Sequence, residues 1–100
     1  MYHNVMKEDI EKYSNPRKVF KLAKELYGDD VAIGLSTNKD KKYMVLDPYT
    51  DKWVHFGQMG YEDYTKHRDN ERRIKFLKRN KKWKTKPMYS PAFLSYHLLW

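Results

Sequence analysis

The residues best suited to chemistry form a short cluster of carboxylates around one histidine: Glu62, Asp63, His67, Asp69 and Glu71. Carboxylates next to a lysine can hold Mg²⁺, so the cluster is compatible with a small metal-dependent nuclease. A simpler interpretation is that acids collect in the first turn of a basic helix, where they offset the helix dipole and neighbouring arginines. The sequence favours the simpler interpretation and leaves the nuclease as an alternative.

No other enzyme signature is found in the sequence. The four histidines, His3, His55, His67 and His97, fall in four different segments without the short spacing of a metal motif, and the chain has no cysteine. Gly34-Leu35-Ser36 lacks the second glycine of a nucleophile elbow, and there is no glycine-rich phosphate loop. We therefore expect a protein that is not an enzyme, with no cofactor and no zinc site.

The positive charge is concentrated in one segment. The 100 residues carry a net charge of +8. Between Lys66 and Lys86, eleven bases face only two acids, so this segment has a net charge of +9 and the remainder of −1. Such a density of like charge favours binding to a polyanion or to an acidic protein surface; a solvated face that only aids solubility is the alternative. The residues expected to make the contact are Arg68, Arg72, Arg73, Lys75, Lys78, Arg79, Lys81, Lys82, Lys84 and Lys86.

DNA or RNA is one partner that suits this segment. Lysines and arginines that neutralise phosphates release counterions, which makes the affinity depend on salt. The nine tyrosines and three tryptophans can stack on unpaired bases, although most of them fall where core residues are needed. No base-reading motif is present, so we expect contacts to the nucleic-acid backbone that are independent of sequence.

The elements that position these residues begin with an amphipathic helix near the N-terminus. Ser14-Asn15-Pro16 is typical of a helix start, and Gly28 of a helix end. Apolar residues between Val19 and Tyr27 recur at three- and four-residue spacings and form one stripe. A further short helix is expected within residues 1–13, which we expect to attach loosely.

A three-stranded antiparallel meander follows the helix. Residues 31–35, 43–46 and 53–56 have the composition of strands, and Pro48 with its neighbouring aspartates marks a tight turn between the second and third. The stripe of the amphipathic helix is expected to cover one face of the sheet. Aromatic residues on both faces of the hairpin suggest that the C-terminal segment shields the other.

The basic helix is expected to run from Asp69 through Trp83, and residues 84–90 are expected to link it to a short C-terminal helical turn. The chain ends in an apolar segment, and leaving it in water would forfeit about 1.5–3 kcal/mol for each large side chain. We expect it to dock on its own domain rather than on another molecule, and its candidate partner-docking aromatics are Phe93, Tyr96 and Trp100. Together these elements predict a single α+β domain over residues 1–100.

Part of the sequence resembles a known group of viral proteins. The pattern His55-Phe56-Gly57, Gly60-Tyr61, Asp63-Tyr64-Thr65, His67 and Asp69, with the ending Tyr89-Ser90-Pro91 to Leu98-Leu99-Trp100, is similar to small basic proteins of the nucleocytoplasmic large DNA viruses. The resemblance brings no active-site residue with it. It implies a viral setting, in which small proteins hold capsomers together or contact DNA and membrane.

The expected function is a non-enzymatic structural or binding protein of such a virus, a minor capsid or other virion component whose basic helix holds an acidic protein surface or nucleic acid. Its partners would be other virion proteins, and its locations the virion and the host cytoplasm or virus factory. The alternative is a sequence-nonspecific DNA- or RNA-binding protein of the infected cell. With no secretory signal, no membrane-spanning run and no cysteine, an intracellular protein without a membrane span is expected.

Overall fold

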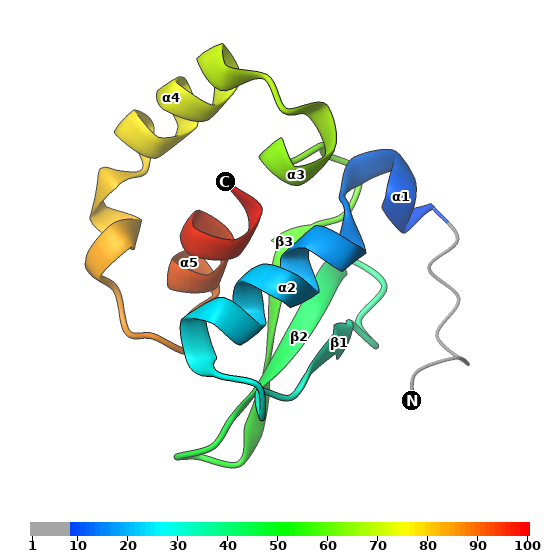
Figure 1. Ribbon diagram of the computed structural model, residues 1–100, viewed down its shortest axis with the longest axis vertical. Helices are drawn as coiled ribbons and strands as arrows, with labels where there is room; N and C mark the ends of the chain where they lie inside the picture. Colours follow the sequence, from blue (N-terminus) through cyan, green and yellow to red (C-terminus); the bar gives the residue numbers. More distant parts are fainter. Residues whose placement is uncertain (1–8) are drawn as a thin grey trace.

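The computed structural model describes residues 9–100 and has the predicted α+β class (Figure 1). Part of the segment expected to hold the first short helix, residues 1–8, lies outside the described residues. None of the helices within residues 9–100 combines the length and the apolar character that crossing a bilayer requires. The elements in order are α1 (Ile10–Tyr13), α2 (Pro16–Tyr27), β1 (Ile33–Leu35), β2 (Lys41–Asp47), β3 (Lys52–Gln58), α3 (Tyr64–His67), α4 (Asn70–Arg79), the 3₁₀ helix η1 (Lys81–Thr85), α5 (Pro91–Leu94) and the π-helical turn η2 (Ser95–Leu99).

Helix α2 begins and ends at the predicted residues. The side chain of Asn15 accepts a hydrogen bond from the backbone N–H of Lys18, and Pro16 occupies the first turn. At the other end the N–H of Gly28 bonds to the carbonyl of Lys24, and Gly28 has a φ of 98°, which a residue with a side chain rarely adopts. Local chemistry therefore sets where this helix begins and ends.

The three strands form an antiparallel sheet in the order β1-β2-β3. Tyr43 pairs with Phe56 and Val45 with Val54 across the hairpin. Because side chains alternate along a strand, all four point to one face. Tyr43, Val45 and Phe56 are 0% exposed there, and they pack in one cluster with the apolar stripe of α2. The meander and its helical cover are confirmed.

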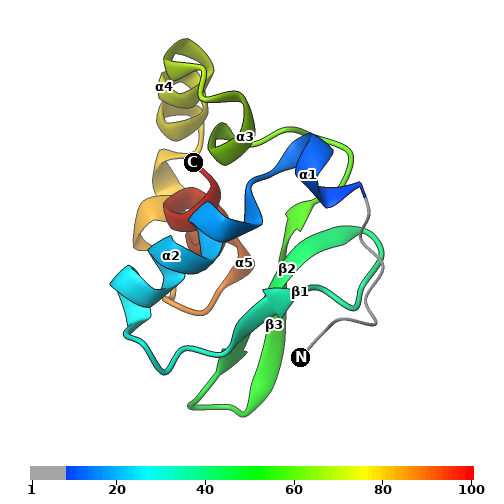
Figure 2. The ribbon, with the colours of Figure 1, turned by 45° about the vertical axis from the view of Figure 1, so that its right-hand side comes forward.

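The C-terminal segment packs on the same face as α2. It places Leu94, Leu98 and Leu99 in the core cluster, and Figure 2 shows α2 and α5 on one side of the sheet. Docking on its own chain is therefore confirmed, whereas the expectation that this segment shields the opposite face is wrong. Trp53, on that opposite face, is 39% exposed.

The predicted basic helix is interrupted. Its N-cap is Asp69, as expected, but α4 ends at Arg79 and the chain continues as η1 instead of one helix through Trp83. Both the backbone N–H and the side-chain amide of Asn80 bond to the carbonyl of Phe76. A side chain that competes in this way for a helical carbonyl favours the end of the helix. The first two residues of the expected 84–90 linker belong to η1, and further along Tyr89 stacks on Tyr27 with ring centroids 4.8 Å apart.

Candidate functional site

All ten residues predicted to contact a partner are exposed, and they follow one another through the end of α3, α4 and η1. Two have an acidic partner within 4.0 Å: Arg72 Nη1 lies 3.7 Å from Glu62 Oε1, and Lys75 Nζ lies 3.2 Å from Glu71 Oε1. The other eight have no such partner anywhere in residues 9–100. The positive charge of this segment is therefore directed to the surface and is not neutralised by the described part of the chain.

The densest part of this surface is a basic strip of six residues: Lys78, Arg79, Lys81, Lys82, Lys84 and Lys86. No acid interrupts residues 78–86. The chain is hollowed here, with a volume of about 630 Å³ lined by residues 78–85. Trp83 lines this hollow and is half-buried, with its ring edge-on to that of Phe76 at a centroid distance of 5.8 Å. The result is a hollowed surface with five cations, no acid and one aromatic side chain in its lining.

The break after α4 shapes this strip. In a continuous helix the basic side chains would spread around the whole circumference. Instead the N–H of Trp83 bonds to the carbonyl of Asn80, and the carbonyl of Lys84 accepts a hydrogen bond from His97 Nε2 at 3.1 Å. The second bond ties η1 to the C-terminal segment. The strip also begins at the C-terminal end of α4, where cations are favoured by the helix dipole.

The structure does not bring the acidic cluster together as a metal site. Glu62 faces Arg72 and Glu71 faces Lys75. Asp69 caps α4 by accepting the N–H groups of Glu71 and Arg72, which is the role that the simpler interpretation assigned to it. No group of three or more potential metal ligands occurs among the residues that the structure describes.

The sequence reasoning missed a buried ion pair. Lys42 Nζ lies 3.0 Å from Asp63 Oδ2, and the two side chains are 3% and 1% exposed. The ammonium group also donates to the carbonyl of Tyr61 at 2.6 Å. Burial lowers the pKa of Lys42, and the neighbouring carboxylate of Asp63 opposes that shift. The one signal in the sequence was that Lys42 directly precedes the apolar run 43–46, since lysine is rarely buried without a partner.

A directed chain of hydrogen bonds leads to the same carboxylate. Tyr43 donates to Ser14, and Thr65 donates to Asp63 Oδ1. Because the only hydroxyl hydrogen of Thr65 is used in this way, Ser14 must donate in the 3.2 Å contact between Ser14 and Thr65. The chain therefore ends on Asp63 Oδ1. It ties α3 to β2 and to the end of α1, and so fixes where α4 starts.

The three candidate docking aromatics are half-buried against their own chain. Trp100 stacks on Phe76 of α4, with centroids 4.1 Å apart and planes 7° from parallel. Phe93 lies 4.1 Å from the ring of His97, and Tyr96 lies 5.1 Å from the same ring. The C-terminal segment thus packs against α4, and the stacking of Trp100 on Phe76 joins the two elements.

Comparison with known proteins gives one match. Residues 31–80 match a family of unknown function, DUF5754. The matched region runs from β1 to the residue that ends α4, so it includes the sheet, the Lys42–Asp63 pair and the first part of the basic surface. Neither the curated proteins nor the solved structures gave a match.

Proposed function

The chain belongs to the DUF5754 family, whose description assigns no activity, and we propose that it is a non-enzymatic binding protein whose basic strip holds the phosphates of a nucleic acid. The observation that carries this proposal is the strip itself. Six exposed cations lie within nine consecutive residues, and none has an acidic partner within the described range 9–100. Their mutual repulsion is relieved when a polyanion is bound.

Nucleic acid suits the strip better than an acidic protein surface does. Protein interfaces gain most of their affinity from buried aromatic and apolar anchors at the centre of the contact. The strip has only one aromatic residue, Trp83, and it is half-buried on its own chain. A nucleic-acid backbone requires only closely spaced cations, because phosphates supply most of its binding. Lysine contacts to phosphate carry no sequence information, so binding should be sequence-independent.

Fluorescence anisotropy with random-sequence DNA tests the proposal. Each phosphate contact contributes about −0.9 to the slope of log K against log salt, so full use of the strip predicts a slope of roughly −5. The triple variant Lys81→Glu/Lys82→Glu/Lys84→Glu should weaken binding at low salt by at least about tenfold. The matched control is Lys24→Glu/Lys39→Glu/Lys52→Glu, which changes the net charge equally at exposed positions outside the strip.

Two results would overturn this assignment. One is that the control variant loses as much affinity as the strip variant, which would mean that net charge alone acts. The other is that no DNA or RNA binds even at low salt. In that case an acidic protein surface becomes the partner to search for, with the same pair of variants.

We propose further that the protein acts as a minor virion component of a nucleocytoplasmic large DNA virus. The support is the resemblance of residues 55–69 and of the segment 89–100 to small basic proteins of these viruses, together with the strip that would contact the genome or a capsid protein. Mass spectrometry of purified particles tests this setting: the protein should be present in stoichiometric amounts. Absence from particles, with the protein abundant in infected cells, would place its nucleic-acid binding in the cell instead.

A further inference from the structure

A second hollow lies on the inner side of α4. It has a volume of about 390 Å³, within the range of about 300–1,000 Å³ that is usual for small-molecule sites. Residues of α2, α3, α4 and the C-terminal segment line it. Four separate parts of the chain thus enclose one cavity, and its floor includes the buried Leu98 and Leu99.

The side chains that line this cavity include cations but no aspartate or glutamate. The cations are Lys18, Arg68 and Arg73. Within residues 9–100, neither Lys18 nor Arg68 has an acidic partner. The Nε of Arg73 donates to the main-chain oxygen of Trp100 at 2.7 Å, and the guanidinium lies over the ring of Tyr64, 4.6 Å from its centroid, so that two contacts hold it in place.

Arg68 is held at this position at an energetic cost. It has a φ of 55°, in the left-handed region, where it ends α3 by bonding its N–H to the carbonyl of Tyr64. A residue with a Cβ pays about 1–2 kcal/mol in this conformation, and glycine would avoid the cost. Strained residues of this kind concentrate at binding sites. The cost is understandable if the arginine side chain is needed at the cavity.

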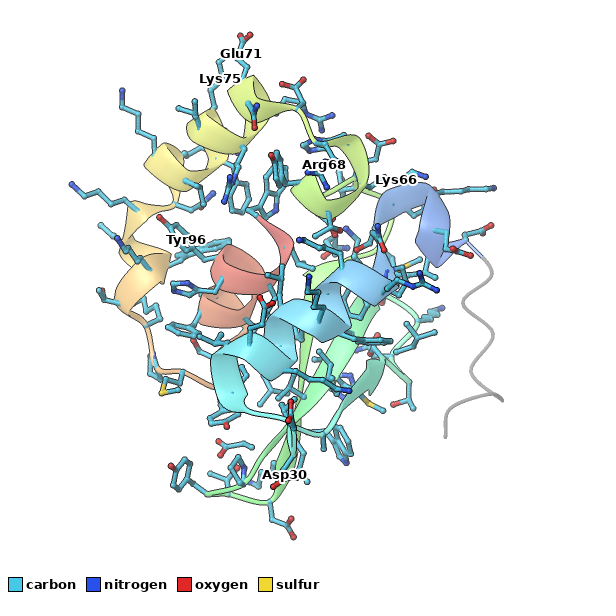
Figure 3. All side chains as sticks on the ribbon, viewed as in Figure 1. Asp30, Lys66, Arg68, Glu71, Lys75 and Tyr96 are labelled. Atoms are coloured by element: carbon cyan, nitrogen blue, oxygen red, sulfur yellow. The ribbon has the colours of Figure 1, made fainter. Side chains whose placement is uncertain are left out.

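Tyr96 adds an aromatic ring to the lining of the cavity. It lies on the side of the C-terminal segment that faces η1 (Figure 3). The nearest ring that the structure gives it is His97, inclined by 63°, so no parallel ring covers Tyr96 within the described residues. An aromatic face of this kind stacks on a nucleobase, whichever base it is.

We propose that this cavity binds one unpaired nucleotide, with the phosphate at Arg68, Arg73 and Lys18 and the base against Tyr96. The inference deepens the proposed function and rests on it: the strip holds the backbone, and the cavity adds a preference for single strands, whose bases are free to enter. Both surfaces border α4, since Leu77 lines the cavity and Lys78, the next residue, begins the strip.

Binding of a short oligothymidine and of a duplex with the same number of phosphates tests the cavity. The single strand should bind more tightly. Tyr96→Ala should weaken single-strand binding about tenfold, the order expected for one lost stacking contact, and should leave duplex binding unchanged. Tyr96→Phe keeps the ring and should retain the affinity. Tyr49→Ala, which removes an exposed tyrosine far from the cavity wall, is the matched control.

Arg68→Gly separates a binding role from a folding role. It removes the guanidinium and also the strain at φ 55°, so it should keep or raise the melting temperature and still weaken the single-strand complex. The inference is overturned if single strand and duplex bind equally to the wild-type protein, or if Tyr96→Ala and Arg68→Gly leave single-strand binding unchanged.

Adenosine monophosphate distinguishes this failure from failure of the proposed function. Nuclear magnetic resonance titration with the mononucleotide probes the cavity without the strip. Shifts at Tyr96 that persist in the Lys81→Glu/Lys82→Glu/Lys84→Glu variant support nucleotide binding, even if no long strand is retained and the strip is not a nucleic-acid site. If strand binding depends on the strip, but the protein shows no single-strand preference and no response to the mononucleotide, the nucleotide-binding role of the cavity is overturned. The proposed function of the strip then stands.

Discussion

Lys42 and Asp63 face each other inside the molecule, and each would be costly to bury without the other. The arrangement is tolerated because each group has a further hydrogen bond besides the ion pair: the ammonium donates to the carbonyl of Tyr61, and the carboxylate accepts from the hydroxyl of Thr65. A buried pair of this kind is weak evidence for a gain in stability over apolar residues, but removing one partner leaves an uncompensated charge. Its structural effect is to hold α3 against β2.

We expect Lys42→Met to lower the free energy of unfolding by about 3–5 kcal/mol, because Asp63 remains as a buried charge without its cation. The double variant Lys42→Met/Asp63→Leu should recover part of this loss. Urea denaturation measures both, and Lys52→Met, at an exposed position, is the control. A loss for Lys42→Met no larger than that of the control would show that water reaches the pair.

His67 makes stability depend on pH. Its Nδ1 accepts the N–H of Asp69, so the hydrogen of the neutral ring is on Nε2, which is buried and has no hydrogen-bond partner among residues 9–100. Burial, reinforced by the nearby Arg72 cation, lowers the pKa of His67. The unfolded chain therefore binds more protons, and the free energy of unfolding should fall as the pH drops from about 7.5 to 5.5, through the ordinary histidine pKa of about 6.5. Urea titrations at several pH values should show a shallower fall for His67→Phe; an identical slope would assign the effect to other groups.

At the scale of elements, the close approach of β3 to the C-terminal segment depends on one glycine. Gly57 has a φ of 82°, and a Cβ there would lie 3.0 Å from Leu99 Cδ1 and 3.2 Å from Lys42 Cβ. Gly60 has a similar φ of 94°, yet a Cβ there would meet nothing within 4 Å. The two positions share the backbone strain of a substitution and differ only in the collision.

We expect Gly57→Ala to destabilise the protein by about 1–3 kcal/mol more than Gly60→Ala, because the added methyl group pushes Leu99 out of its place in the core. Thermal unfolding followed by circular dichroism compares the two variants. Equal losses would show that Leu99 moves aside at no cost and that the C-terminal segment is less tightly seated than its burial indicates.

Elements bounded by local chemistry could be predicted from the sequence. Asn15, Pro16 and Gly28 mark both ends of α2, and the composition of 43–46 and 53–56, with Pro48 between them, predicted the hairpin. The end of α4 was not predicted, because it depends on the hydrogen bonds of a single residue, Asn80. Nothing else in the surrounding run of cations signals the end of a helix. The face covered by the C-terminal segment was also missed, since local pattern does not say which side of a sheet a distant segment reaches.

For the whole molecule, the candidate surfaces also divide into one that the sequence predicts and one that only the fold creates. Charge density is a property of the sequence, and the exposed strip could be read from it without knowledge of the fold. The cavity behind α4 could not, because Lys18, Arg68 and Tyr96 are separated along the chain and meet only after α2, α3 and η2 have packed. The ion pair between Lys42 and Asp63 was hidden for the same reason.

The strip should also cost the free protein stability. With a net charge of +8 and most of its surplus in one segment, self-repulsion opposes the compact state at low salt. Raising NaCl from about 10 mM to 200 mM shortens the screening length from about 30 Å to less than 10 Å, so the melting temperature should rise. The variant Lys81→Gln/Lys82→Gln/Lys84→Gln should have a higher melting temperature than the wild-type protein at low salt, and its melting temperature should rise less as salt is added. Scanning calorimetry measures both, and a wild-type melting temperature that stays flat would mean that the lysines are too far apart to repel.

The place of Trp83 among the lysines of the hollow has a practical consequence. An indole is fluorescent, and its emission responds when a nucleobase comes close or when surrounding water is displaced. Trp100 lines the second hollow, behind α4, where it is stacked on Phe76. The protein thus carries an optical probe at each of its two candidate surfaces, and a titration can be followed without attaching a dye.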